Sequence, residues 1–255
     1  MRSDALSRNH NLVNPLDRNH KSIFIAPLES AAQPVEVPLA HGGEAFWLDG
    51  RTIGHVVAEG DDDSKVASLY AVSVRFTGGS LDATADPPVL LGKFPTASPS
   101  SFRYAAKAGL LVFSDNVHED GELTKVPEND RQWDERGDTA LVYDNAYERH
   151  WDTWVGPKRP SLFTVKLSKD AENKWHFGDQ FTNVLHGTRH VSRDGCCPSC
   201  TLTIEQYTPV EPFGGSNDYD VSDEYIVYTT KDPELPEAWH TKQNVRISNS
   251  RFVSD

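Results

Sequence analysis

Ser68-Leu69-Tyr70-Ala71-Val72 is one of three occurrences of a short phrase: a serine, an aliphatic residue, an aromatic residue and then β-forming residues. The other two are Ser22-Ile23-Phe24-Ile25 and Ser161-Leu162-Phe163-Thr164-Val165. The first interval is 46 residues and the second is 93, close to twice that. A repeat of about 40 to 50 residues built from short strands is typical of a β-propeller, in which each repeat forms one blade.

Hairpin signals accompany the phrase. The segment Phe46-Trp47-Leu48-Asp49-Gly50-Arg51-Thr52-Ile53 places Asp-Gly, a strong turn signal, between two apolar runs. Looser copies occupy residues 102–113 and 219–228, where an aromatic residue starts one strand and an aliphatic strand returns after a polar turn. The phrase at Ser68 follows Phe46 by 22 residues, and we expect it to supply a later strand of the same blade.

These signals predict an all-β fold. No stretch keeps apolar residues at helical spacing over three turns. We expect an incomplete β-propeller of about four to five blades, with no α/β-hydrolase domain. The blades are expected near residues 21–75, 88–167 (one blade or two) and 209–247.

The domain boundaries follow from the same patterns. Residues 1–20 are polar and predict a disordered lead-in to the partial propeller at 21–247. Within it, residues 193–207 lose the strand pattern, so we expect an irregular, poorly packed insertion. The last residues, 248–255, also abandon the blade pattern and predict an aberrant tail. Both segments are compatible with translated intron sequence.

Composition and charge indicate which kinds of binding partner and which cellular location to expect. A net charge of −13 disfavours nucleic acid, because binding a polyanion needs a basic surface. The longest apolar run, Ala108 to Phe113, is too short to span a membrane. The amino terminus lacks the apolar core of a signal peptide, and the chain has no Asn-x-Ser/Thr sequon. These features favour a cytoplasmic protein that does not bind membranes, and no motif calls for a cofactor.

The sequence lacks the motif that usually marks the nucleophile of a serine hydrolase. The nucleophile elbow reads Gly-x-Ser-x-Gly and joins a strand to a helix. The nearest stretches, Gly78-Gly79-Ser80 and Gly214-Gly215-Ser216, lack the second glycine, and we interpret both as turns. No catalytic residue is assigned.

A metal site has weak support. Cys197 and Cys200 form a Cys-x-x-Cys pair, and His186 and His190 lie just upstream. Two cysteines and two histidines suit tetrahedral zinc as ligand types, but only six residues separate the pairs, against about a dozen in a zinc finger. We therefore predict no metal site and keep these four residues as the alternative.

The densest cluster of functional side chains is Tyr147-Glu148-Arg149-His150-Trp151-Asp152-Thr153-Trp154. Such groups are costly to bury without partners. As one strand, the segment would place Arg149 and Trp151 on one face and His150 and Asp152 on the other. One face could then meet a ligand while the other packs. A purely structural role, with hydrogen bonds between blades, stays open.

Two stretches resemble a known family. Residues 140–152, which contain Tyr143-Asp144 and Arg149-His150-Trp151-Asp152, resemble a motif reading approximately Tyr-Asp-x-Leu-Phe-Val-Arg-His-Trp-Asp. The stretches Pro212-Phe213-Gly214-Gly215 and 219–245 are also similar to that family. It is the dipeptidyl-peptidase V and acylaminoacyl-peptidase branch of the prolyl oligopeptidase family of serine peptidases. This chain departs from the motif at Asn145-Ala146 and at Glu148.

The resemblance implies a two-part architecture. In that family a propeller covers an α/β-hydrolase domain, which carries the Ser, Asp and His of catalysis, and the propeller admits short or unfolded peptides. The expected function is therefore a truncated propeller domain that lacks the catalytic triad and is inactive alone, with peptides and a separate hydrolase domain as partners. Arg149, His150, Trp151 and Asp152 are the candidates for facing substrate.

Two other function classes remain open. One is a stand-alone propeller that binds protein partners. The other is a propeller glycosidase, which would need two carboxylates flanking one glycosidic bond. Glu119-Asp120 is an example of an acidic pair, but with 38 acidic residues such pairs are expected by chance.

Overall fold

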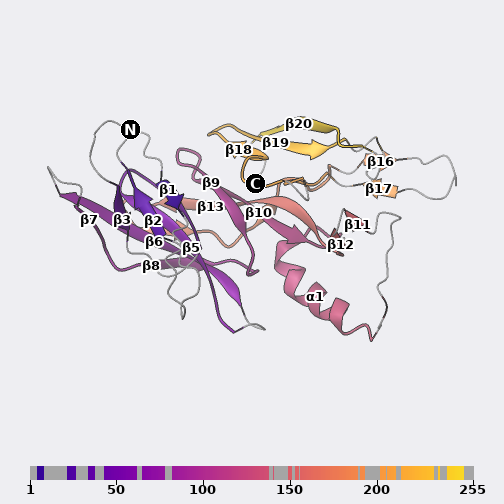
Figure 1. Ribbon diagram of the computed structural model, residues 1–255, viewed down its shortest axis with the longest axis horizontal. Helices are drawn as coiled ribbons and strands as arrows, with labels where there is room; N and C mark the ends of the chain where they lie inside the picture. Colours follow the sequence, from indigo (N-terminus) through magenta and orange to yellow (C-terminus); the bar gives the residue numbers. More distant parts are fainter. Residues whose placement is uncertain are drawn as a thin grey trace. The chain divides into compact units, whose positions relative to one another are not determined.

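The computed structural model describes most of the chain, and Figure 1 labels most of its helices and strands. The described residues are 5–8, 22–26, 34–37, 43–61, 65–77, 82–137, 140, 149–150, 153–154, 156–188, 190–192, 202–204, 206–210, 214–232, 235 and 240–249. They are mostly β-strand, with one short α-helix. The chain divides into two compact units, residues 1–97 with 167–177, and residues 98–166 with 178–255.

The first unit contains the early strands and one late strand. They are β1 (Ala5–Arg8), β2 (Ser22–Ile25), β3 (Val35–Val37), β4 (Glu44–Trp47), β5 (Thr52–Glu59), β6 (Val66–Thr77), β7 (Asp82–Ala85), β8 (Val89–Lys93) and β14 (Trp175–Phe177). β1, β2 and β3 form one antiparallel sheet, and β4 to β7 form another in sequence order, with β8 also paired to β6.

The second unit holds the remaining elements. They are β9 (Ser100–Ala105), β10 (Leu110–Val117), η2 (Leu123–Lys125), α1 (Val126–Asp134), β11 (Arg149–His150), β12 (Thr153–Trp154), β15 (Thr182–Asn183), β16 (His190–Ser192), β17 (Leu202–Ile204), β18 (Tyr219–Val221), β19 (Tyr225–Lys231) and β20 (Gln243–Asn249). β13 (Arg159–Lys169) contributes residues 159–166 to this unit and residues 167–169 to the first.

All three serine phrases are strands, as predicted. They lie in β2, β6 and β13, and each of these strands pairs with neighbours on both sides. The hairpin signals are also confirmed, because β4 pairs with β5 around Asp49-Gly50, β9 pairs with β10, and β18 pairs with β19. Antiparallel pairing in sequence order is what a propeller blade requires, although the number of blades stays a prediction.

Two blade boundaries differ from the prediction. Residues 21–75 contribute to two sheets rather than one, because β2 and β3 pair separately from β4, β5 and β6. The strand β8, expected to open the next blade, pairs back onto β6 through Ser68 to Ala71. Apolar alternation marks the strands but does not specify which neighbour each one takes.

A small apolar core joins the two sheets of the first unit. Ile25 and Val37 come from one sheet, and Ile53 and Val74 come from the other. Close packing also fixes Gly92, because a Cβ atom there would overlap the ring of Phe177. Phe177 in turn packs edge-on against Phe94, with ring centroids 5.2 Å apart.

β10 is the central strand of the second unit. Its residues 110–115 are all buried, so both faces of the strand are covered. One face carries Phe113, which lies opposite Phe163 of β13 and packs against Phe102 and Phe181. A strand covered on both faces reads as a continuous apolar run, as Leu110 to Phe113 does.

The other face of β10 belongs to a second core. Leu110, Val112 and Leu162 gather there with Tyr219, Ile226 and Tyr228 of the sheet β18-β19-β20. The hydroxyl of Tyr228 donates a buried hydrogen bond of 3.0 Å to Gln206. Burial raises the pKa of Tyr228.

Three segments are more regular than the sequence suggested. α1 is a helix with proline in its first turn, a favoured place for proline. β20 extends to Asn249, so the expected tail at 248–255 begins as a paired strand. Within 193–207, Leu202–Ile204 forms β17 and pairs with β16, and Gln206 and Tyr207 are buried. The other residues of these two segments lie outside the described residues, and the domain boundaries stay a prediction.

In the described part of the chain, no helix combines the length and apolar character of a membrane span.

The aromatic packing around β10 gives a stability prediction. Phe113 is fully buried, so Phe113→Ala should leave a cavity and lower the free energy of unfolding by about 3 to 5 kcal/mol. Val245→Thr, at a side chain 68% exposed, keeps a β-branched residue and should change it by less than about 0.5 kcal/mol. Urea unfolding of the two variants tests this. Equal effects would show that the Phe113 packing does not stabilise the chain.

Candidate functional site

The predicted substrate-facing segment forms a hairpin. β11 and β12 pair antiparallel, with Arg149 opposite Trp154 and His150 opposite Thr153. The chain reverses direction between β11 and β12, so Arg149 and Thr153 do not lie on one continuous strand, the arrangement considered from the sequence.

The role proposed for this segment stays a prediction. Trp151 and Asp152 lie outside the described residues, and for Arg149 and His150 only the backbone is described. Whether these four residues face a ligand is therefore untested.

The alternative metal ligands also stay untested. His186 is exposed in a turn after β15, and His190 begins β16, whereas Cys197 and Cys200 lie outside the described residues. Within the described ranges, no group of three or more His, Cys, Asp or Glu side chains could hold a metal ion.

A polar cluster lies where β10 and β13 end their ladder. Val117 pairs with Arg159, so the next residues outward, His118 and Lys158, emerge at the same end of the two strands. Asp130 of α1 accepts a hydrogen bond from Lys158 Nζ at 2.8 Å, and its other carboxylate oxygen lies 2.8 Å from His118 Nε2. One carboxylate thus ties the helix to both strands.

The charge of Asp130 is favoured by these contacts. Burial alone would raise the pKa of Asp130, but the hydrogen bonds from Lys158 and His118 outweigh it and hold the pKa below its ordinary value of 3.8. Neighbouring polar side chains also form hydrogen bonds. Asp120 accepts from the Asn129 amide at 2.9 Å, and Ser161 donates to Asn183 at 2.8 Å. The first hydrogen bond holds α1 to the turn before it, and the second joins β13 to β15.

A second polar contact occurs at the predicted Asp49-Gly50 turn. Lys169 Nζ lies 2.9 Å from Asp49 and 5.2 Å from the Trp175 ring centroid. Burial alone would raise the pKa of Asp49, but the hydrogen bonds from Lys169 and from the Arg51 N–H keep it below the ordinary value. The carboxylate fixes the hairpin turn.

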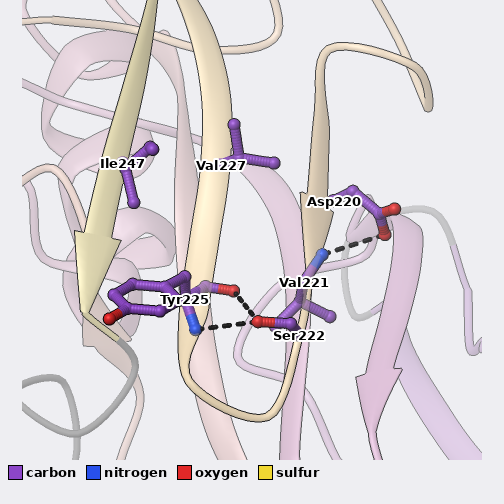
Figure 2. Close-up of a pocket in the computed structure, with 6 residues that line it drawn as sticks. All are labelled: Asp220, Val221, Ser222, Tyr225, Val227 and Ile247. Atoms are coloured by element: carbon purple, nitrogen blue, oxygen red, sulfur yellow. Dashed lines mark hydrogen bonds between the residues drawn. The ribbon is translucent and has the colours of Figure 1, made fainter.

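The sheet β18-β19-β20 carries a shallow hollow on its outer face (Figure 2). Its volume is about 260 Å³, and Asp220, Val221, Ser222, Tyr225, Val227 and Ile247 line it. Asp220, Val227 and Ile247 lie opposite one another on the three strands, forming one row across the sheet. The hollow is therefore built by strand register.

The apolar side chains of this face are exposed. Ile247 is 70% exposed, Val245 68% and Tyr225 49%. At the other end of the row, the Asp220 side chain is 75% exposed; its Oδ1 accepts from the Val221 N–H at 2.9 Å and lies 3.8 Å from Arg103 Nε. One end of the row is thus anionic and the other is apolar.

The hollow suits binding better than catalysis. The Ser222 hydroxyl accepts a hydrogen bond from the Tyr225 N–H at 3.0 Å and donates to the Tyr225 carbonyl at 3.2 Å, so it is used in the β18–β19 turn. A serine nucleophile needs a hydroxyl that is free to transfer its proton to a neighbouring base, whereas this hydroxyl donates its proton to a backbone carbonyl.

The sequence contained a signal for this face that we did not use. Residues 244–248 alternate polar and apolar residues, with Val245 and Ile247 two apart, as in a strand. No sequence signal indicated that Asp130 would bind His118 and Lys158. These two residues are brought together by the pairing of β10 and β13, which are separated in sequence by α1.

Comparison with known proteins supports a link to a peptidase family. Over 102 residues, 39% of this chain, the sequence is 32% identical to dipeptidyl-peptidase 5 of Trichophyton equinum. Over 123 residues, 48% of the chain, it is 30% identical to dipeptidyl-peptidase 5 of Schizosaccharomyces pombe. These matches span 12% and 15% of the relatives' lengths.

No family model matches the chain, and no solved structure matches it.

The cluster around Asp130 gives a pH-dependent prediction. Asp130→Asn should lower the free energy of unfolding at pH 7 by about 1 kcal/mol, because the carboxylate is 39% exposed and solvent screens both ion pairs. Because the pKa of Asp130 is lowered on folding, its ionised carboxylate stabilises the folded chain at any pH above the ordinary pKa of 3.8. This stabilisation is lost as the pH falls through the folded-state pKa. The difference in the free energy of unfolding between Asp130→Asn and wild type should therefore shrink towards zero as the pH falls below the folded-state pKa of Asp130.

Urea unfolding across this pH range measures the effect. The matched control is Asp134→Asn, on the same helix at an exposed position. If both variants lost the same stability at pH 7, Asp130 would have no special role in holding α1.

Proposed function

We propose that this chain is a propeller-type β-sheet region of a dipeptidyl-peptidase 5-like serine peptidase, and that it serves peptide access and not peptide hydrolysis. The observation that carries the proposal is the 30–32% identity to dipeptidyl-peptidase 5 over 102 to 123 residues. Antiparallel sheets with sequential strand order are consistent with such a region.

The chemistry of acyl transfer supports a non-catalytic role. Hydrolysis at neutral pH needs a nucleophile activated by a neighbouring base, together with donors that stabilise an oxyanion. The 255 residues contain no Gly-x-Ser-x-Gly motif. Two serines with described surroundings, Ser161 and Ser222, have hydroxyls committed to structural hydrogen bonds.

A stand-alone binding module is the second candidate. The exposed apolar row on the sheet β18-β19-β20 favours it, because contiguous apolar patches on a protein surface often mark contact sites. A glycosidase has no comparable support, since Asp120 accepts hydrogen bonds from Asn129 and the Glu122 N–H.

Sequencing of the full transcript separates the two candidates. An in-frame region with a Gly-x-Ser-x-Gly elbow joined to these residues supports the peptidase proposal. A mature transcript that encodes only these residues favours the binding module.

We expect the purified chain to release no dipeptides from chromogenic substrates and to show no labelling by a serine-directed fluorophosphonate. The physical reason is that an isolated serine hydroxyl without a base is essentially unreactive. Dipeptidyl-peptidase 5 from Schizosaccharomyces pombe, assayed in parallel, is the positive control. Stoichiometric labelling of one serine, with turnover abolished when that serine is replaced, would refute this prediction.

A further inference from the structure

The sheet β18-β19-β20 carries apolar side chains on both faces. Tyr219, Ile226 and Tyr228 fill the core on its inner face. The outer face presents Tyr225, Val227, Val245 and Ile247, three of them about half to two-thirds exposed. Antiparallel sheets with one face in water usually alternate apolar and polar residues. The outer face of this sheet therefore has the character of a contact surface.

The size of the face excludes a large partner interface. β18 has three residues, and β19 and β20 have seven each; at about 3.3 Å per residue and about 4.8 Å between strands, the three strands cover roughly 270 Å². A stable dimer buries about 800 Å² on each partner. This face alone is too small for a second copy of the chain and fits a single extended segment.

The hollow sets the size of the group that enters it. Its volume of about 260 Å³ lies below the range of about 300 to 1,000 Å³ that is usual for small-molecule sites. It is open and lined by Tyr225, Val227 and Ile247, so it suits one apolar side chain of a peptide.

The negative charge of Asp220 favours a cationic residue beside that apolar side chain. Asp220 ends the row that continues through Val227 to Ile247, and its carboxylate is 75% exposed. Arg103 lies 3.8 Å away through Nε, a loose contact that leaves the carboxylate open to a further cation. The net charge of −13 also attracts cationic segments to the chain.

We propose that the outer face of β18-β19-β20 binds an extended peptide segment in which an apolar side chain enters the hollow and an adjacent Lys or Arg pairs with Asp220. The segment lies across the strands, with its apolar residues against Val245 and Ile247. This binding involves no hydrolysis and does not depend on the proposed peptidase link.

The probe is a fluorescein-labelled nonapeptide of alternating threonine and valine with a central leucine followed by one lysine. Its matched partner carries glutamate in place of the lysine. Fluorescence anisotropy with the full chain, up to millimolar concentration, measures both affinities. We expect the lysine peptide to bind about tenfold more tightly, because the glutamate would face Asp220.

Variants of the chain test the two contacts separately. Val245→Thr with Ile247→Thr should weaken binding about tenfold, while keeping β-branched residues in the strand. Val89→Thr with Leu90→Thr, at exposed positions of β8, is the matched control and should change nothing. Asp220→Asn should remove the preference for lysine, whereas Asp61→Asn, which removes an equal charge elsewhere, should preserve it.

Several outcomes would overturn the proposal. One is that neither peptide binds, and another is that the β8 control weakens binding as much as the β20 variant. Equal affinity for the lysine and glutamate peptides would remove Asp220 from the site. Sedimentation showing a dimer that the β20 variant dissociates would identify a second copy as the occupant. Thermal melting of each variant confirms that it is folded.

Discussion

The ladder between β10 and β13 is the contact on which the second unit depends. It pairs Leu110 to Val117 with Arg159 to Lys166, joining segments separated by α1 and the hairpin β11–β12. Phe113 lies opposite Phe163 within it, and both side chains are buried. The ladder also brings His118 and Lys158 to one end, where Asp130 binds both. Helix and strands are thus held through one long-range pairing.

The strands were the most predictable part of the molecule. Ser68-Leu69-Tyr70 and its two copies predicted strands, because alternating and β-branched residues follow local backbone preference. Asp49-Gly50 predicted its hairpin for a similarly local reason. What the sequence could not provide was partner choice, so β8 was expected in a new blade although it pairs with β6. Pairing depends on contacts between distant residues, which local propensity does not encode.

The missed elements have physical reasons too. α1 is short and polar, with Val126 its one buried residue, so it lacks the apolar periodicity by which helices are recognised. Its attachment through Asp130 is an ionic contact visible only once β10 and β13 are paired. The end of β20 was missed because Ser248 and Asn249 are both polar and were assigned to the tail, although both pair with β19. The hairpin at Arg149 to Trp154 was missed because alternation alone does not show where a strand turns.

The serine of the repeated phrase has a structural role and need not be a nucleophile. Ser68 and Ser161 are both buried, in central strands. The Ser161 hydroxyl donates to Asn183 Oδ1, which also accepts from the Leu185 N–H, while the Asn183 amide donates to the Gly121 carbonyl. A small hydroxyl therefore connects β13 to the turn after β15 and to the loop that precedes α1. A buried serine bonded in this way is positioned for stability and is inaccessible to a substrate. Recurring serines in a chain that is similar to dipeptidyl-peptidase 5 over part of its length thus need not mark a nucleophile. Binding by this chain is better sought on the exposed face of β18-β19-β20.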